Sequence, residues 1–337
     1  MNYLLKSKNR IITEFDQFRS IKFTTVNKPE CICGQCMSLK PFSINRNISV
    51  IYSKGTKNLA SIQMRLPQSA KHLLFHNPNI KITGVCLQSS EIYQIKNQHI
   101  ILSKFAAINI TNYDLTILSK NGNTVFVDSI DGEIDLKKFQ KEHTLVASSH
   151  RQFEYFKNES KSKVELVYHA SDLRLKTVKA QNHYFSIGYF GSLSRIPKEF
   201  SSIDNLSVIK TPLSFEPKLK TPRFSKELKD YSAHLVVGTR VPRLVFKPFT
   251  KGLIATNVGA VTLISGDDIE ALLLLGNNYP YVTTSSRKRS ILEVANYMKN
   301  TFLDREWKTA QSLHKKLMPL CCEQNIAFNW GRIFVEI

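Results

Sequence analysis

The chain has 337 residues, of which 42% are hydrophobic, so it is long enough for about two domains with well-formed cores. Its 47 Lys and Arg outnumber 27 Asp and Glu, and the net charge of +20 favours acidic partners such as nucleic acid, anionic lipid headgroups or a charged polysaccharide. The longest apolar runs fall far below the roughly 18–20 residues that span a bilayer, and residues 1–10 contain no signal-peptide core. We therefore expect a cytoplasmic protein, with peripheral contact to the inner face of a membrane as a further option.

Residues 1–45 form a polar, basic segment that is expected to pack on the first domain or to lead into it. The segment contains Cys31, Cys33 and Cys36, a spacing that can bind zinc, but no second Cys-x-x-Cys pair supplies the remaining ligands. Cys321 and Cys322 would complete such a site only by chance of folding. A metal site and reduced, free thiols both remain open, and we expect no metal.

Short apolar runs alternate with helical stretches between residues 46 and 178, which we interpret as a first Rossmann-like domain. The expected strands cover residues 47–52, 80–87, 99–103, 124–127, 143–147 and 164–168. The expected helices cover residues 65–75, 104–113 and 148–156. Continuous apolar runs are typical of parallel strands buried on both faces, so this pattern predicts a doubly wound sheet wrapped by helices.

The pattern restarts after a polar linker, and residues 179–322 are interpreted as a second Rossmann-like domain. The expected strands cover residues 185–190, 206–209, 233–237, 260–264 and 281–282, and a Pro- and Lys-rich loop is expected over residues 210–225. The expected helices cover residues 247–259 and 267–275, with basic final helices reaching residue 322. Residues 323–337 form a tail, for which a return to the first domain is one option.

Two lysines flank the start of the helix expected over residues 247–259. A helix N-terminus carries unpaired N–H groups and a partial positive charge, and therefore attracts anions. Lys247 and Lys251 would add full charges at the same place, so an anionic ligand such as a nucleotide diphosphate is expected. The alternative is a surface helix with two solvated lysines.

Four segments, taken in order, resemble parts of the two-domain glycosyltransferases of the GT-B fold. In the first half of the chain, residues 125–131 resemble the edge of the acceptor domain. Residues 145–149 together with 167–172 resemble the helix and strand through which the chain leaves that domain for the linker. In the second half these are residues 187–192, similar to the first strand and glycine turn of the donor domain, and residues 251–259, similar to the Lys-helix-Gly pattern before a buried strand. The resemblance covers residues 47–310 and implies an α/β protein with two Rossmann-like, doubly wound parallel-sheet domains facing a cleft.

The resemblance implies a bacterial enzyme that moves a sugar from a nucleotide-sugar donor to a glycan or lipid-linked acceptor during surface polysaccharide or lipopolysaccharide synthesis. It implies no metal and no cofactor beyond the donor. Where related enzymes often carry a Glu that holds the donor, this chain has Ile254, and Asp267, Asp268 or Glu270 would have to substitute. Two alternatives remain: a non-catalytic relative that binds glycan, and a nucleic-acid-binding protein, although the basic residues form no recognised module.

The resemblance also implies the site residues, since helix dipoles, close backbone approach at glycine and basic side chains would neutralise the leaving diphosphate. The diphosphate candidates are Gly191, Ser192, Arg240, Arg243, Lys247 and Lys251, and the sugar or nucleoside candidates are Asp268, Glu270 and Tyr281. The acceptor-side candidates are Lys54, Gly55, Thr56, Arg65 and Asp128, and the catalytic candidates are His169 and Asp172. Structural alternatives stay open for several of them: a basic loop for Arg240 and Arg243, a turn for Asp128, a structural role for His169 and strand packing for Tyr281.

Overall fold

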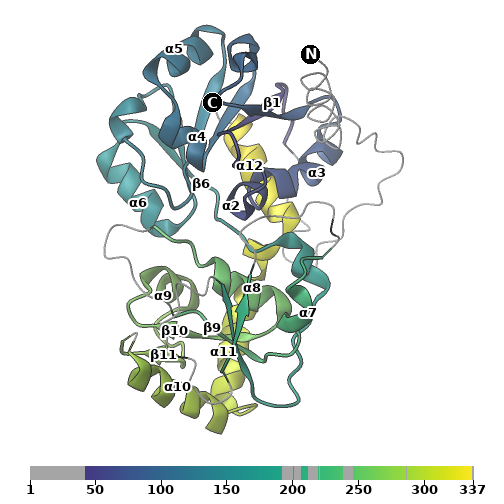
Figure 1. The fold of residues 1–337 in the computed structure, drawn as a ribbon, viewed down its shortest axis with the longest axis vertical. Coiled ribbons are helices and arrows are strands. Elements are labelled where there is room, and N and C mark those ends of the chain that lie inside the picture. Colours follow the sequence, from purple (N-terminus) through teal and green to yellow (C-terminus); the bar gives the residue numbers. More distant parts are fainter. Residues whose placement is uncertain are drawn as a thin grey trace, which may run out of the picture.

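The structure is a computed structural model that describes residues 42–191, 200, 206–211, 219, 221–237, 246–285 and 287–335. Of the candidate residues, Ser192, Arg240, Arg243, Cys31, Cys33 and Cys36 lie outside these ranges. The described chain forms two lobes, each built on one parallel sheet (Figure 1). This confirms the expected α/β class with two doubly wound sheets.

The first lobe is built on six parallel strands in the order β2-β1-β3-β4-β5-β6. They are β1 (Ile48–Tyr52), β2 (Ile82–Cys86), β3 (His99–Ser103), β4 (Thr124–Asp128), β5 (Thr144–Ala147) and β6 (Lys163–Leu166). All residues of β3 and of β5 are buried, as expected for strands covered on both faces. The apolar runs of the sequence therefore located every strand of this sheet.

The helices of the first lobe agree only in part with the expected ranges. They are α2 (Ala60–Gln63), α3 (Leu66–His76), α4 (Lys104–Asn109), α5 (Asn112–Lys120) and α6 (His150–Glu159), with 3₁₀ turns η1 (Ser90–Gln94) and η2 (Leu136–Lys138). The single helix expected over residues 104–113 is wrong, because α4 ends and α5 begins within that stretch. The cause is a capping box at Thr111, whose hydroxyl accepts from the Asp114 amide at 3.1 Å while the Asp114 carboxylate accepts from the Thr111 amide at 3.0 Å.

The second lobe is built on five parallel strands in the order β11-β10-β9-β7-β8. They are β7 (Ile187–Gly191), β8 (Leu206–Lys210), β9 (Ala233–Leu235), β10 (Val261–Ser265) and β11 (Val282–Thr283). The helices are α7 (Ser225–Leu228), α8 (Thr250–Val258), α9 (Ile269–Leu275), α10 (Lys288–Asn300) and α11 (Arg305–Lys316), with 3₁₀ turns η3 (Leu173–Thr177) and η6 (Met318–Cys321). Helix α8 ends at Gly259, whose φ of 82° turns the chain into β10.

The last described helix, α12 (Glu323–Val335), packs on α3 of the first lobe, although α11 belongs to the second lobe (Figure 1). Its buried residues Trp330 and Phe334 join the core formed by residues of β1, α3 and β4. The chain therefore crosses between the lobes twice, once through η3 and once at the start of α12. Within the described ranges, no helix combines the length and the apolar character needed to cross a membrane.

The residues that follow the strands of the first sheet meet the segment that leads into α8. The Ser149 hydroxyl, just after β5, donates to the Phe246 carbonyl at 3.3 Å. The Phe249 amide, just before α8, donates to the Tyr168 hydroxyl after β6 at 3.0 Å. We call this boundary the interlobe seam. In doubly wound folds, ligands bind at the carboxyl ends of the strands, and here those ends meet along the seam.

Candidate functional site

Lys251 reaches from the first turn of α8 to the carboxyl end of β7. Its Nζ lies 4.0 Å from the ring centroid of Tyr189, and a Cβ placed on Gly191 would stand 2.8 Å from the same nitrogen. The N-cap residue of α8 is Phe249, whose side chain makes no capping hydrogen bond to the first turn of the helix. An ammonium group, a glycine backbone and uncapped helix amides thus converge, which is an arrangement suited to an anion.

Asp131 lies three residues after β4 and faces basic groups from both lobes. The Nζ of Lys104 stands 2.6 Å from Asp131 Oδ1. Burial alone would raise the pKa of Asp131, but the Lys104 ammonium, with smaller contributions from His169 and Lys247, holds it below its usual value. Asp131 is therefore a carboxylate at neutral pH, and Lys247 of the second lobe is among the charges that lower its pKa.

His169 is buried beside this carboxylate, with 6% of its surface exposed. Burial, reinforced by Arg65 and opposed by Asp131, lowers its pKa to about 3, so the ring is neutral at physiological pH. Its Nδ1 has no hydrogen-bond partner among the described residues, which is unusual for a buried polar atom. A neutral ring is a poor proton donor at physiological pH, and the burial of His169 limits its contact with a ligand in this structure.

Arg65 and Asp128 form a buried ion pair. The Arg65 Nη2 lies 2.8 Å from Asp128 Oδ1 and its Nε lies 2.9 Å from Oδ2, while Nη1 donates to the Val167 carbonyl at 2.6 Å. Both side chains are 3% exposed. In this structure the pair ties α3 to the ends of β4 and β6, and the acceptor-side role of both residues stays a prediction. At this strand end the partly exposed carboxylate is Asp131.

Asp172 also has structural partners. Its carboxylate pairs with Arg174 Nη2 at 2.6 Å, accepts from Gln68 Nε2 at 2.5 Å and caps η3 by accepting from the Arg174 amide at 3.0 Å. With 4% of its surface exposed, it has little access to a ligand. In this structure Asp172 serves as a cap and ion pair at the first crossing between the lobes, and its catalytic role stays a prediction.

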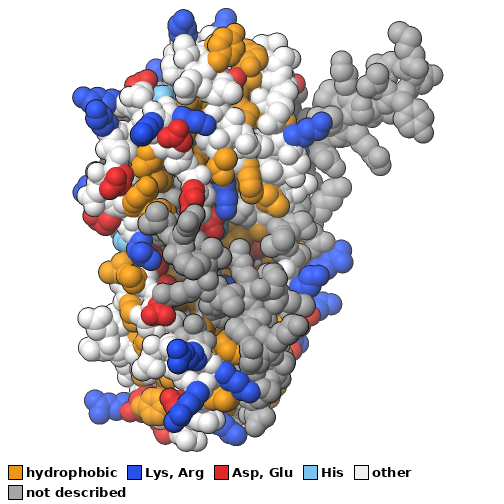
Figure 2. All heavy atoms as spheres, turned by 60° about the vertical axis from the view of Figure 1, so that its left-hand side comes forward, with side chains coloured by type: hydrophobic (Ala, Val, Ile, Leu, Met, Phe, Trp, Pro, Cys, Tyr) orange, Lys and Arg blue, Asp and Glu red, His pale blue; other side chains and the backbone are white. Residues whose placement is uncertain are grey.

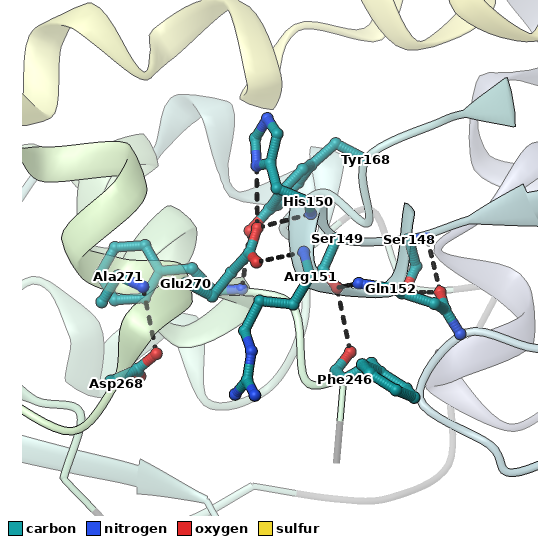
Figure 3. A network of polar contacts seen from close by, with 11 residues as sticks. Ser148, Ser149, His150, Arg151, Gln152, Tyr168, Phe246, Asp268, Glu270 and Ala271 are labelled. Carbon is teal, nitrogen blue, oxygen red and sulfur yellow. Dashed lines mark hydrogen bonds and ion pairs between the residues drawn. The ribbon is translucent and has the colours of Figure 1, made fainter. Parts of the chain in front are cut away.

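Glu270, a donor-sugar candidate, instead joins the two lobes (Figure 3). Its Oε1 accepts from the His150 amide at 2.9 Å and lies 3.0 Å from His150 Nδ1, and its Oε2 accepts from the Arg151 amide at 3.1 Å. Burial would raise the pKa of Glu270, but these hydrogen bonds hold it below its usual value. The Glu270 carboxylate is 2% exposed and binds the first amides of α6, and its contact with the donor stays a prediction.

The two remaining sugar or nucleoside candidates have local roles. Asp268 is the N-cap of α9, and its carboxylate accepts from the Ala271 amide at 3.1 Å (Figure 3). Tyr281 is fully buried, with its hydroxyl 3.1 Å from Thr301 Oγ1 and its ring packed near Trp307. Of the two interpretations given to Tyr281, the structure supports strand packing.

The segment from Lys54 to Thr56 forms a turn at the carboxyl end of β1. Gly55 has a φ of 79°, and the Thr56 hydroxyl donates to the Ser53 carbonyl at 2.7 Å. Lys54 is exposed, and its amide donates to Gln88 Oε1 at 2.8 Å. This turn lies on the same sheet edge as Asp131, but β3 separates the two strands that carry them.

Two residues of the site, Lys104 and Tyr168, are not predicted by the sequence. For Asp131 the sequence leaves two interpretations open, orienting an acceptor hydroxyl or turning the chain at Gly132. The signal that could have found Lys104 and Asp131 is positional: each follows a neighbouring strand, β3 or β4, at its carboxyl end. In the sequence Tyr168 is the last residue of an apolar run, and no pattern near it predicts its contact with the start of α8. Among the described residues, no group of three or more His, Cys, Asp or Glu side chains is placed to hold a metal ion.

No protein-family model and no curated protein sequence matches the chain. Its structure is similar to that of a glycosyltransferase from Rickettsia africae, with a TM-score of 0.59 and 8% identity over 87% of this chain and 98% of that chain. It is also similar to sucrose-phosphate synthase from Thermosynechococcus elongatus, with a TM-score of 0.53 and 9% identity over 87% of this chain and 97% of that chain. At such identities the likeness shows the fold alone: two Rossmann-like domains in the GT-B arrangement.

Proposed function

We propose that this protein is a glycosyltransferase that moves a sugar from a nucleotide-sugar donor to a glycan or lipid-linked acceptor without a metal. The observation that carries the proposal is the position of the Lys251 ammonium beside Gly191, at the uncapped start of α8. This arrangement stands at the carboxyl end of β7, in a fold shared with a glycosyltransferase. A nucleoside diphosphate has the charge that such a place attracts.

The proposed reaction breaks the bond between the anomeric carbon and the diphosphate oxygen and forms a bond from that carbon to an acceptor hydroxyl. Negative charge grows on the departing diphosphate, where Lys251, Lys247 and the helix amides would stabilise it. Asp131 would accept a hydrogen bond from the acceptor hydroxyl across the interlobe seam. Because its pKa is held low, Asp131 is a weak base, and its proposed role is to orient the hydroxyl. The hydroxyl proton passes to the oxygen of the departing diphosphate as the new bond forms.

An apolar pocket in the first lobe supports a lipid-linked acceptor. The pocket is small and lies between β1, β2 and the α2–α3 region, and its lining includes Val50, Tyr52, Ile62, Pro67, Ile82 and Gly84. Lys57 also lines it and would suit an anionic headgroup. A role in bacterial surface polysaccharide or lipopolysaccharide synthesis, at the inner face of the membrane, is part of this proposal. Ile62→Trp should fill the pocket and weaken a lipid-linked acceptor while sparing the donor.

The alternative of nucleic-acid binding rests on the net charge of +20. On the face drawn in Figure 2, the described Lys and Arg side chains are spread over both lobes, with Asp and Glu between them. A nucleic-acid footprint would gather basic residues into a patch or stripe. We therefore favour the glycosyltransferase, and binding of polyanions that falls steeply with salt would favour the alternative.

The deciding experiment is thermal stability against nucleotides and nucleotide sugars at low and moderate salt. A ligand at about 100 times its dissociation constant adds roughly 2.7 kcal/mol to the free energy of unfolding. We expect one nucleoside diphosphate and its sugar to stabilise the protein, and Lys251→Ala to remove that effect. The control is Lys299→Ala, an exposed lysine near the end of α10. Stabilisation by polyanions alone would overturn the proposal.

A further inference from the structure

Tyr168 connects the start of α8 to the first lobe through a chain of hydrogen bonds. The Phe249 amide, at the N-cap of α8, donates to the Tyr168 hydroxyl at 3.0 Å. The Tyr168 hydroxyl also lies beside the Glu270 carboxylate, and this interaction lowers the pKa of Glu270. Burial raises the pKa of Tyr168 well above its usual value, so the hydroxyl stays protonated at neutral pH and can donate a hydrogen bond to that carboxylate. The contacts run from the amide to the hydroxyl and from the hydroxyl to the carboxylate.

Glu270 is itself fixed by the first lobe. The amides of His150 and Arg151, in the first turn of α6, donate to its two oxygens (Figure 3). The His150 ring adds a contact of 3.0 Å, and its hydrogen bond to Glu270 raises the pKa of His150. A carboxylate at a helix N-terminus is also favoured by the helix dipole. The chain of bonds therefore runs from α8 through Tyr168 and Glu270 to a rigid helix of the other lobe.

The consequence concerns Lys251, which lies two residues after Phe249. Since α8 has no side-chain cap among the described residues, the Tyr168 hydroxyl is the group that holds its N-cap amide. We infer that Tyr168 and Glu270 are positioning residues that set the first turn of α8, and with it Lys251, relative to Gly191. This inference rests on the proposed function, because it names what holds the diphosphate-binding helix in place.

The first test is amide hydrogen exchange in the full-length protein. Tyr168→Phe removes the hydroxyl and keeps the ring, so exchange in peptides that contain residues 249–253 should become at least about tenfold faster. The matched control is Tyr281→Phe, which also removes a buried tyrosine hydroxyl bonded to a neighbour, Thr301, in the second lobe. That control should leave exchange in α8 unchanged. Equal exchange in Tyr168→Phe and wild type overturns the inference.

The second test uses inorganic pyrophosphate as the probe and measures its affinity by calorimetry. Tyr168→Phe should bind it about tenfold more weakly than wild type, and Glu270→Ala should act in the same direction. In a Lys251→Gln background the effect of Tyr168→Phe should largely disappear, because the group that it positions is gone. A full, additive effect in that background would show that Tyr168 acts only on general stability, and would overturn the inference.

The two proposals fail in different ways. If wild type binds pyrophosphate, Lys251→Gln weakens it and Tyr168→Phe does not, then the positioning role is wrong and the anion site stands. If wild type and Lys251→Gln both fail to bind, the anion site is wrong, and a role in positioning it is overturned as well. The exchange experiment then still reports whether Tyr168 holds the start of α8.

Discussion

The Lys251 ammonium occupies the space that a side chain at Gly191 would need. A Cβ on Gly191 would lie 2.8 Å from Lys251 Nζ, 3.1 Å from its Cε and 3.1 Å from the Tyr189 hydroxyl. Because the end of a lysine side chain moves easily, Gly191→Ala should displace Lys251 at little cost in stability. We expect at least about tenfold weaker pyrophosphate binding, which corresponds to about 1.4 kcal/mol, measured by calorimetry.

The matched control for this substitution is Gly259→Ala, at the other end of α8. Gly259 has a φ of 82° and open space around its Cα, so alanine there strains the backbone without touching Lys251. It should lower stability by about 1–2 kcal/mol and leave the affinity unchanged. Wild-type affinity in Gly191→Ala would contradict the assignment of Lys251 to the anion site.

Asp131 should be needed for transfer and not for donor binding. Asp131→Asn keeps the shape, removes the charge that pairs with Lys104, and should lower kcat on the order of 100-fold. Nucleotide binding, followed by thermal stability, should remain. Asp135→Asn is the comparison, since Asp135 lies in the same loop region and only caps η2. A kcat near the wild-type value in Asp131→Asn would remove this residue from the proposed mechanism.

The pair of Arg65 and Asp128 should matter for folding rather than for chemistry. Both side chains are 3% exposed, so Arg65→Met leaves a buried carboxylate without its partner and should cost about 3–5 kcal/mol. The double variant Arg65→Met, Asp128→Leu should recover most of that loss, as judged by urea unfolding. A cost below about 1 kcal/mol in the single variant would fit an exposed pair and contradict the buried one.

Acid should destabilise the protein through buried histidines. Burial lowers the pKa of His169, His234 and His314 to about 3, compared with about 6.5 in the unfolded chain. The unfolded state therefore binds more protons between these values. Stability is fully present above about pH 6.5 and falls as the pH drops towards 3, by up to about 1.4 kcal/mol per pH unit for each histidine. Urea unfolding at about pH 7 and about pH 5 measures this loss.

The variant that isolates one of these groups is His234→Leu. Its Nε2 is buried without a hydrogen-bond partner in the described part of the chain, and its ring packs against Phe190 at 4.7 Å. Leucine should flatten the acid dependence and cost little near neutral pH. His183→Leu, at an exposed linker position, should keep the wild-type slope. A slope unchanged by His234→Leu would show that this ring takes up its proton in the folded protein.

The strands could be predicted from the sequence where they are buried on both faces. Strands β3 and β10 are buried along their whole length, so their apolar runs are continuous and unambiguous. The start of α6 was equally predictable, because its N-cap residue, Ser149, directly precedes the helix in the sequence. The split between α4 and α5 was missed, because a capping box at Thr111 overrides a continuous helical spacing.

The site could be predicted only in part, because partners distant in sequence decide which groups face a ligand. Asp128 and Asp131 are alike in the sequence, and only the fold brings Arg65 to the first of them. The sequence places Glu270 near the helix expected to bind the donor, and therefore suggests a contact with the donor. In the structure its partners, His150 and Arg151, come from the other lobe. Lys251 and Gly191 are both diphosphate candidates in the sequence, because a helix start and a glycine turn are features that a local pattern shows, and the structure places the two side by side.

The position of α12 has a consequence for synthesis of the chain. Trp330 and Phe334 are buried with Ile48 and Leu66 in one core, so the first lobe combines early and late parts of the sequence. The ribosome must therefore translate the whole second lobe before the first can close its core. The first lobe is therefore synthesised first but should complete its folding last. Until α12 is made, the early strands of this lobe keep apolar surface exposed, as expected for a fold with high contact order.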